Sequence, residues 1–418
     1  MRRWYRNLDV STLLIWTALC ACGLVAIYSS THGDAQEFLL NTVQNSFQRQ
    51  RLWLMISIVA LVTILSVPMR LLIRMVPWIY LATIGILILA LVIGREVGGA
   101  RSWVYFGPIG FQSSELAKVG GLLMAAFVLA SRRKEKSILP TAIIAAGALG
   151  LPALLIILQN DLGTALVFVG LMPVLALCSG VPLRIVGLLI LFPIAGYLAI
   201  LSWPVAWGFT ALVGIIAWYG TRSRMWVTAG VIASAMTVGV ATFALQHVLQ
   251  PHQVARIASF SNPEADEYRA NVGFHLVQSK AALGSGGWFG LGFRQGTQTQ
   301  GRYIPEQSTD FVFSVIGEEW GFIGGILVLT LFAALMLRLL WLARAIDHPF
   351  GNLVVAGVAG IFLIHVCVNI GMVLGLLPVI GIPLPFLSYG GSALLTNTTL
   401  LGLALACYMR RAEFSLYV

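Results

Sequence analysis

The sequence has few charged residues. Asp, Glu, Lys and Arg make up 10% of its 418 residues, whereas soluble globular domains usually carry about 25%. Hydrophobic residues reach 58%, and the mean hydropathy is +0.88. This composition excludes an ordinary soluble domain.

Cysteine is also scarce, and its positions exclude two kinds of site. The five cysteines all lie inside apolar runs: Cys20, Cys22, Cys178, Cys367 and Cys407. Their spacing matches neither a disulfide framework nor a zinc site. We interpret them as small packing residues and predict no dedicated metal site.

Long apolar runs are what the sequence has in abundance. They are continuous rather than alternating, and their length suits membrane-spanning helices better than barrel strands. We predict an all-α polytopic membrane protein, with residues 1–418 forming a single integral membrane domain. About twelve transmembrane helices are expected, over residues 11–30, 52–67, 77–93, 114–131, 138–158, 162–178, 184–201, 205–219, 226–246, 311–337, 352–375 and 393–409.

The distribution of charge sets the orientation. With the N-terminus in the cytoplasm, 16 of the 26 Lys and Arg residues but only 4 of the 16 Asp and Glu residues lie inside. Cytoplasmic loops of membrane proteins are enriched in Lys and Arg. We therefore predict a multi-pass protein of the cytoplasmic (inner) membrane with both termini cytoplasmic. The basic excess needs no nucleic acid partner.

Polar residues gather in four segments on the predicted outer side, and the first covers residues 99–118. It contains Arg101, and it ends with Glu115 and Lys118, which are three residues apart and can pair on a helix. Two interpretations stay open: an ion pair that holds the entry of the helix, or a binding site for an anionic headgroup.

The second segment, residues 159–164, separates two predicted spans. Asp161 stands directly before the apolar run that starts at residue 162. Asp is among the preferred N-cap residues of helices. We predict that Asp161 caps the following helix.

The third segment is a large extracytoplasmic loop, residues 247–310, which carries Arg256 and Lys280. Its Gly-rich run at 284–292 lacks the Gly-Lys-Ser/Thr of a P-loop. We predict that these glycines let an interfacial segment lie flat, with Trp288 and Phe289 as membrane anchors.

The loop ends with Glu306 and Asp310, at the junction with a long apolar run. A carboxylate at the mouth of a membrane helix is costly, and it indicates a functional site by default. The alternative for Asp310 is an N-cap of the helix expected over 311–337.

The fourth segment, residues 376–392, contains three prolines and the pair Gly390-Gly391, so it cannot continue a helix. Backbone freed at membrane depth must be buried in protein or line an aqueous cavity. We expect Ser388, Gly390 and Gly391 to be structural neighbours of the site. On its own, this segment could equally be an ion or substrate gate.

In this order and spacing, the four segments resemble the SEDS family of cell-wall glycan polymerases. The most specific matches are Phe111–Lys118, Gln159–Thr164, Pro305–Phe311 and Pro383–Ser392. The similarity covers the chain except the region around 184–225. Residues 296–300 and Ala393 resemble the elongation (RodA-type) members more than the division (FtsW-type) members.

Two departures from the family pattern accompany this resemblance. Usual members have ten spans, so the helix pair expected over 184–225 resembles an insertion. They also usually carry proline where this chain has Ser113 and Asn160.

The resemblance implies an enzyme that polymerises lipid II, the undecaprenyl-pyrophosphate-linked disaccharide, on the outer face of the membrane during cell elongation. It implies a class B penicillin-binding transpeptidase and elongation-complex membrane proteins as partners. The essential aspartate of the family maps onto Asp310.

The chemistry of glycosyl transfer assigns roles to the other polar residues. Asp310 is the candidate general base. The candidate substrate-binding residues are Arg101, Glu115, Lys118, Arg256, Lys280 and Glu306, and the structural residues near the site are Asp161, Ser388, Gly390 and Gly391. A divalent cation such as Mg²⁺ could bridge the pyrophosphate without a dedicated site.

Three alternatives stay open at this point. A flippase or transporter of lipid-linked precursors also uses broken helices and buried charges, but no inverted repeat is visible in the sequence. A division-specific polymerase shares the same motifs. A scaffold for the transpeptidase would need no chemistry at Asp310.

Overall fold

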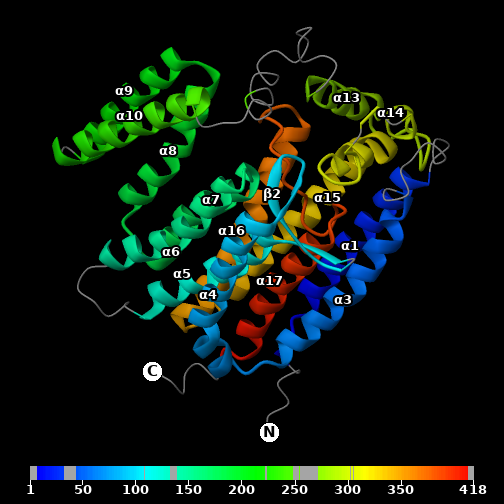
Figure 1. Cartoon of the computed structure of the whole chain (residues 1–418), viewed down its shortest axis with the longest axis horizontal. Helices are drawn as coiled ribbons and strands as arrows, with labels where there is room; N and C mark the ends of the chain where they lie inside the picture. Colours follow the sequence, from blue (N-terminus) through cyan, green and yellow to red (C-terminus); the bar gives the residue numbers. More distant parts are fainter. Residues whose placement is uncertain are drawn as a thin grey trace. The chain divides into compact units, whose positions relative to one another are not determined.

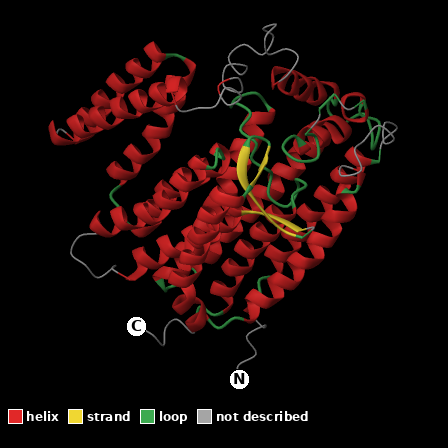
Figure 2. Ribbon diagram, in the orientation of Figure 1, coloured by secondary structure: helices red, strands yellow, loops and turns green. Residues whose placement is uncertain are grey.

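The computed structural model describes residues 7–32, 44–107, 109–131, 139–221, 224–247, 254, 272–301, 303–304 and 306–412. The chain divides into two compact units. Unit 1 comprises Met1–Ser179 and His275–Val418, and unit 2 comprises Gly180–Phe274. Helices dominate the described residues, and one small sheet accompanies them (Figure 2).

Unit 1 contains nine helices that are long and apolar enough to span a membrane, counted over the described residues. They are α1 (Val10–Thr31), α3 (Ser46–Ser66), α4 (Met69–Ile93), α5 (Ser113–Ser131), α6 (Leu139–Leu158), α7 (Leu162–Ser179), α15 (Val312–Arg344), α16 (Pro349–Val373) and α17 (Gly391–Met409). The most buried are α5, α16 and α17, so these three form the centre of unit 1 (Figure 1).

Unit 2 consists of three apolar helices in its described part: α8 (Leu183–Leu201), α9 (Trp203–Thr221) and α10 (Arg224–His247). Each packs against the other two. Their shared core is made of small side chains, namely Ala195, Ala199, Ala206 and Val238. Small residues let helices approach closely in a membrane. A hydrogen bond of 3.0 Å between the hydroxyls of Thr210 and Ser234 joins α9 to α10.

Each of the twelve predicted spans corresponds to one of these helices, which confirms a multi-pass helical membrane fold. The predicted ends were wrong where arginines flank a span. Thus α3 starts at Ser46 and not at 52, α4 starts at Met69 and not at 77, and α15 reaches Arg344 and not 337. Arginine side chains can extend towards water while the helix continues. The insertion of a helix pair at 184–225 stays a prediction.

A three-stranded antiparallel sheet was not predicted. It comprises β1 (Arg95–Val97), β2 (Ala100–Phe106) and β3 (Ile109–Gln112), in the order β1-β2-β3. Gly98 and Gly99 join the first two strands with φ of 60° and 84°, as a type I′ hairpin turn requires. Because β3 runs directly into α5, the sheet positions the start of that helix.

Helix α15 is broken at Gly321, where φ is 64° and ψ is −160°. Ahead of the break, the carbonyl oxygens of residues 318–319 accept hydrogen bonds from the N–H groups of residues 291–292 at 2.9 and 3.1 Å. Beyond it, the N–H groups of residues 322–323 donate to the carbonyls of residues 287–288. The Gly-rich segment therefore replaces hydrogen bonds that the helix loses.

This backbone contact depends on glycine. A methyl group at Gly290 would lie 2.1 Å from the carbonyl oxygen of Glu319, and one at Gly286 would lie 2.0 Å from that of Gly317. Trp288 and Phe289 project from the same segment and are exposed. Their role as membrane anchors stays a prediction.

An ion pair joins the start of α1 to the final turns of α15. Asp9 caps α1 by accepting from the Thr12 N–H at 3.0 Å, and Arg338 donates to both of its oxygens, at 2.5 and 3.2 Å. Burial alone would raise the pKa of Asp9, but the hydrogen bonds from Arg338 and Thr12 outweigh it and lower this pKa. Trp341 of α15 also contacts Tyr408 of α17. The start of α1 and the ends of α15 and α17 thus lie at one end of unit 1 (Figure 1).

We predict that Gly290→Ala destabilises the protein by about 1–3 kcal/mol, because φ is +82° at this position and Glu319 blocks the added methyl group. Thermal unfolding of the purified protein in detergent measures the effect. Gly284→Ala is the matched control, because it lies in a helix (Val272–Ser285) with open space around it, and alanine favours helices. Equal melting temperatures for the two variants would contradict this account of the α15 break.

We predict that Asp9→Asn lowers stability at pH 7 by roughly 0.5–1 kcal/mol, because asparagine still caps the helix but leaves Arg338 without a counter-charge. Since the folded pKa lies below the ordinary value of 3.8, the ion pair stabilises above that value, and the stabilisation is lost as pH falls through the folded pKa. Melting curves at decreasing pH should therefore converge for wild type and variant. A gap that stays constant down to about pH 3 would refute the ion-pair origin.

Candidate functional site

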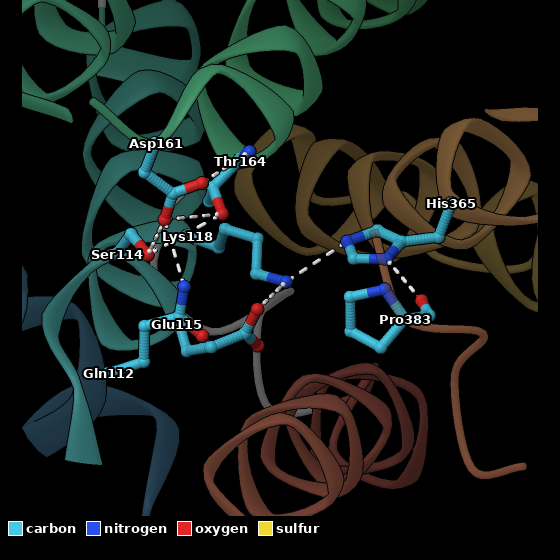
Figure 3. Close-up of polar contacts among 8 residues, drawn as sticks. All are labelled: Gln112, Ser114, Glu115, Lys118, Asp161, Thr164, His365 and Pro383. Carbon is cyan, nitrogen blue, oxygen red and sulfur yellow. Dashed lines mark hydrogen bonds and ion pairs between the residues drawn. The ribbon is translucent and has the colours of Figure 1, made fainter. Parts of the chain in front are cut away.

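The carboxylate of Asp161 joins the first and second polar segments. Its Oδ2 accepts from Gln112 Nε2 at 2.8 Å and from Ser114 Oγ at 2.7 Å. The N–H of Thr164 donates to Oδ1 at 3.1 Å, which is the N-cap interaction predicted for α7. Figure 3 shows Asp161 between Ser114 and Thr164. One side chain thus caps α7 and holds the start of α5 beside it.

Glu115 and Lys118 form a buried network with His365, a residue that the sequence analysis missed. Lys118 Nζ lies 2.9 Å from Glu115 Oε1 and 3.0 Å from His365 Nε2. All three residues are 1% exposed. In Figure 3 the Lys118 chain extends from α5 towards the His365 ring on α16. The predicted ion pair therefore exists, and a third group completes it.

The second ring nitrogen of His365 joins this network to the fourth polar segment. Nδ1 lies 3.0 Å from the carbonyl oxygen of Pro383. Because a carbonyl oxygen only accepts, we assign the ring proton to Nδ1. The Nε2 atom of a neutral ring is then an acceptor for the Lys118 ammonium group. His365 thus links α5 to the Pro-rich segment with a defined tautomer.

Asp310 lies in the turn that precedes α15. Phe311 occupies the N-cap position of that helix and makes no side-chain capping bond, so the alternative role of Asp310 as N-cap is wrong. Asn369 Nδ2 donates to the backbone carbonyls of Asp310 and Ile382, each at 2.8 Å. Asp310 is partly exposed. Its main chain is held by a buried amide of α16.

Further hydrogen bonds satisfy the backbone of the fourth segment. The N–H of Tyr389 donates to the carbonyl of Ser308 at 2.7 Å, beside Asp310 in the chain. Gln50 of α3 donates to the Ser388 carbonyl and accepts from the Gly390 N–H, both at 3.2 Å. The segment is thereby joined to the third segment and to α3.

The residues predicted to be structural neighbours of the site each hold the local backbone in place. Ser388 Oγ accepts from the Leu384 N–H at 2.8 Å and closes a turn. At Gly391 a methyl group would lie 2.1 Å from Trp53 Nε1, so only glycine lets α17 start against α3. The N–H of Gly390 donates a hydrogen bond to Gln50 Oε1.

The other predicted substrate-binding residues lie nearer the surface. Arg101 is exposed on β2 and donates from Nε to the Gly94 carbonyl at 3.2 Å. Lys280 is exposed on α13 (Val272–Ser285), with its Cε atom close to Gly375. Glu306 is exposed and accepts from Thr309 Oγ1 at 2.8 Å. Arg256 lies outside the described residues.

Glu115 has an oxygen that the network does not use. Its Oε2 is buried and has no hydrogen-bond partner in the described part of the chain. A buried acceptor without a partner costs about 1–3 kcal/mol. The substrate-binding role of the Glu115–Lys118 pair stays a prediction.

Sequence reasoning also missed two adjacent carboxylates on α15. Glu318 accepts from the N–H groups of Gln298 and Thr299 at 2.7 and 2.9 Å, and so holds the short helix α14 (Thr297–Gln300). Glu319 accepts from Ser29 Oγ of α1 and from Gln300 Nε2. Both lie in the span predicted over 311–337, and intramembrane carboxylates are the signal that could have identified them.

A search of the described residues finds no three His, Cys, Asp or Glu side chains arranged to hold a metal ion. Both ring nitrogens of the buried His365 are already in hydrogen bonds, with Lys118 and with the Pro383 carbonyl. The participation of a divalent cation such as Mg²⁺ stays a proposal.

The chain is similar to known proteins over nearly its whole length. The model of the FtsW/RodA/SpoVE family, described as "Cell cycle protein", matches residues 10–209 and 205–412. The peptidoglycan glycosyltransferase RodA of Treponema pallidum is 34% identical, over 97% of this chain and 98% of the relative. The peptidoglycan glycosyltransferase MrdB of Escherichia coli is 31% identical, over 98% and 95%.

Solved structures share the fold. A chain of a peptidoglycan synthase complex that coordinates polymerization and crosslinking aligns with a TM-score of 0.71 and 27% identity, over 97% of this chain and 99% of that one. The crystal structure of the rod shape determining protein RodA of Thermus thermophilus aligns with a TM-score of 0.62 and 27% identity, over 97% of each chain. The chain therefore belongs to the FtsW/RodA/SpoVE family, the SEDS family that its four polar motifs resemble.

Proposed function

We propose that this chain is a peptidoglycan glycosyltransferase that polymerises lipid II on the outer face of the cytoplasmic membrane. The observation that carries the proposal is the convergence of all four polar segments in one hydrogen-bonded assembly that includes Asp310. The full-length similarity to relatives named peptidoglycan glycosyltransferase supports it.

Asp310 is the base of the proposed reaction. Its carboxylate takes the proton from the acceptor sugar hydroxyl while the hydroxyl oxygen attacks the anomeric carbon of the donor. The bond between that carbon and the pyrophosphate oxygen breaks, and the lipid pyrophosphate leaves with the electron pair. The turn that carries Asp310 is held by Asn369, and fixed geometry favours such a transfer.

Cationic side chains stabilise the departing pyrophosphate in this proposal. Arg101 and Lys280 are exposed and can meet a headgroup directly, and arginine suits bidentate contact with phosphate. Lys118 is buried and supplies positive charge from behind the site. Arg256 is assigned the same task from its sequence position. Glu115 and Glu306 are assigned to the sugar hydroxyls.

A divalent cation such as Mg²⁺ is proposed to enter with the pyrophosphate, because Mg²⁺ commonly binds through substrate phosphates and one or two carboxylates. Among the described residues of the third segment, Asp310 is a partly exposed and Glu306 an exposed carboxylate, and either could complete its coordination. No step of the proposed transfer depends on it.

The proposed partners follow from the relatives. The peptidoglycan synthase complex that shares this fold joins polymerization to crosslinking, so a class B penicillin-binding transpeptidase is the proposed partner here. The similarity to proteins named RodA and MrdB favours a role in the elongation complex over the division-specific role of FtsW. Both termini are proposed to lie in the cytoplasm.

A lipid-precursor flippase is the second candidate, and one observation favours it. Helix α15 is broken at Gly321, and residues 376–390 leave the helical state between α16 and α17. Broken helices of this kind are frequent in transporters. Parallel assays in proteoliposomes separate the two functions, one for lipid II polymerisation and one for headgroup translocation.

We predict that Asp310→Asn abolishes lipid II polymerisation by the purified protein in proteoliposomes, because the amide cannot accept the hydroxyl proton. The expected loss is at least about 100-fold, the usual contribution of a general base. Asp347→Asn is the matched control, since Asp347 is an exposed carboxylate in the α15–α16 connection. Activity retained by Asp310→Asn would remove Asp310 as the base.

We predict opposite labelling of two cysteine variants in a background without the five native cysteines. Glu306→Cys should react with an impermeant thiol reagent added outside the cell, and Asp347→Cys only after the membrane is opened. Both positions are exposed in the structure. Labelling of residue 306 from the cytoplasm alone would reverse the proposed topology.

A further inference from the structure

Two buried polar residues of α16 lie one helical turn apart and make parallel contacts. His365 and Asn369 are 1% and 0% exposed, and residues four apart share one face of a helix. His365 meets the carbonyl of Pro383, and Asn369 donates to the carbonyl of Ile382. Two consecutive carbonyls of the Pro-rich segment are therefore held by one face of α16.

The second ring nitrogen of His365 and the second amide hydrogen of Asn369 reach groups of the proposed site. His365 Nε2 accepts from the Lys118 ammonium group at 3.0 Å. Asn369 Nδ2 donates to the Asp310 carbonyl at 2.8 Å. The turn of the predicted base and the buried cation thus contact adjacent turns of α16.

The contacts of α16 with the Pro-rich segment follow from the hydrogen-bonding needs of that backbone. Pro383 and Pro385 have no N–H and interrupt the helical state, and the carbonyls of Ile382 and Pro383 find their donors on α16. His365 and Asn369 each supply one donor to that backbone. One acceptor nitrogen of His365 is directed at Lys118, and the second amide hydrogen of Asn369 is directed at the Asp310 carbonyl.

We propose that His365 and Asn369 are positioning residues that hold the Lys118 ammonium group and the Asp310 turn at a fixed spacing along α16. This inference rests on the proposed function. It adds the two residues that fix the spacing between the proposed base, Asp310, and the cation, Lys118. Neither residue touches substrate. His365 acts through Lys118, and Asn369 acts through the main chain of Asp310.

The His365 half is tested by a double-mutant cycle with Lys118 in lipid II polymerisation. His365→Leu should raise KM about tenfold, because it removes a hydrogen bond to a charged group. In a Lys118→Met background the same substitution should change KM less than about twofold, since the partner is gone. A purely structural role for the ring would give the same penalty in both backgrounds and would overturn the inference.

Rescue by glutamine sharpens this test. The amide of His365→Gln can donate to the Pro383 carbonyl and accept from Lys118, so its KM should return to within about threefold of wild type. His365→Asn has the same groups on a shorter stem and should not bridge both partners, so it should resemble His365→Leu. If His365→Leu does not fold, the comparison of KM between His365→Gln and His365→Asn still tests the bridge. Equal KM values for the Gln and Asn variants would contradict the proposed bridge.

The Asn369 half predicts a different kinetic signature. Asn369→Asp is nearly isosteric but cannot donate when ionised, so the Asp310 turn loses its anchor. We expect kcat to fall about 100-fold with KM within about threefold of wild type, because small displacements of a catalytic group are costly. Cys367→Ala on the exposed side of α16 is the control. Melting curves identify variants that simply lose their fold, and Asn369→Ser then repeats the test with a side chain that cannot reach both carbonyls.

The failure of this inference can be told from failure of the proposed function. Asp310→Asn and Lys118→Met are measured beside the α16 variants. An active Asp310→Asn enzyme would refute the proposed base and overturn the inference with it. An inactive Asp310→Asn enzyme, together with Asn369→Asp at wild-type kcat or with equal His365→Leu penalties in both Lys118 backgrounds, would overturn the inference alone.

Discussion

Backbone N–H and C=O groups that leave a helix at membrane depth need partners inside the protein, because lipid offers none. Two parts of this chain leave the helical state: α15 at Gly321, and residues 376–390. The first is satisfied by the Gly-rich segment. The second is satisfied by α16, by Gln50 of α3 and by Ser308. Distant parts of the sequence meet at the site because they supply these partners.

The buried charges follow the same rule at higher cost. Moving charges out of water costs several kcal/mol per ion, and a buried ion pair often fails to recover it. The network of Glu115, Lys118 and His365 keeps its charges balanced, since the imidazole is a neutral acceptor. It nevertheless leaves one carboxylate oxygen without a partner. The proposed function would account for the energetic cost of this network.

The helical membrane fold was predictable because hydrophobic length is a direct physical requirement of the bilayer. Asp161 was predictable for a similar reason, since an N-cap needs only local geometry. The sheet of residues 95–112 was not predictable in the same way. Its strands are short and partly polar, and they pair with each other outside the apolar runs. The ends of α3, α4 and α15 were missed because arginine marks an interface but does not end a helix.

The sequence alone determined that this chain crosses the membrane many times and that its polar residues gather in four segments. Both properties depend only on the length of the apolar runs and on the positions of the polar residues between them. It also indicated Asp310, through a carboxylate beside an apolar run. Only the tertiary structure decided that Lys118 meets His365 and that Asn369 holds Asp310. These contacts join residues 59 and 247 positions apart, and such pairing depends on how helices pack, which no local pattern encodes.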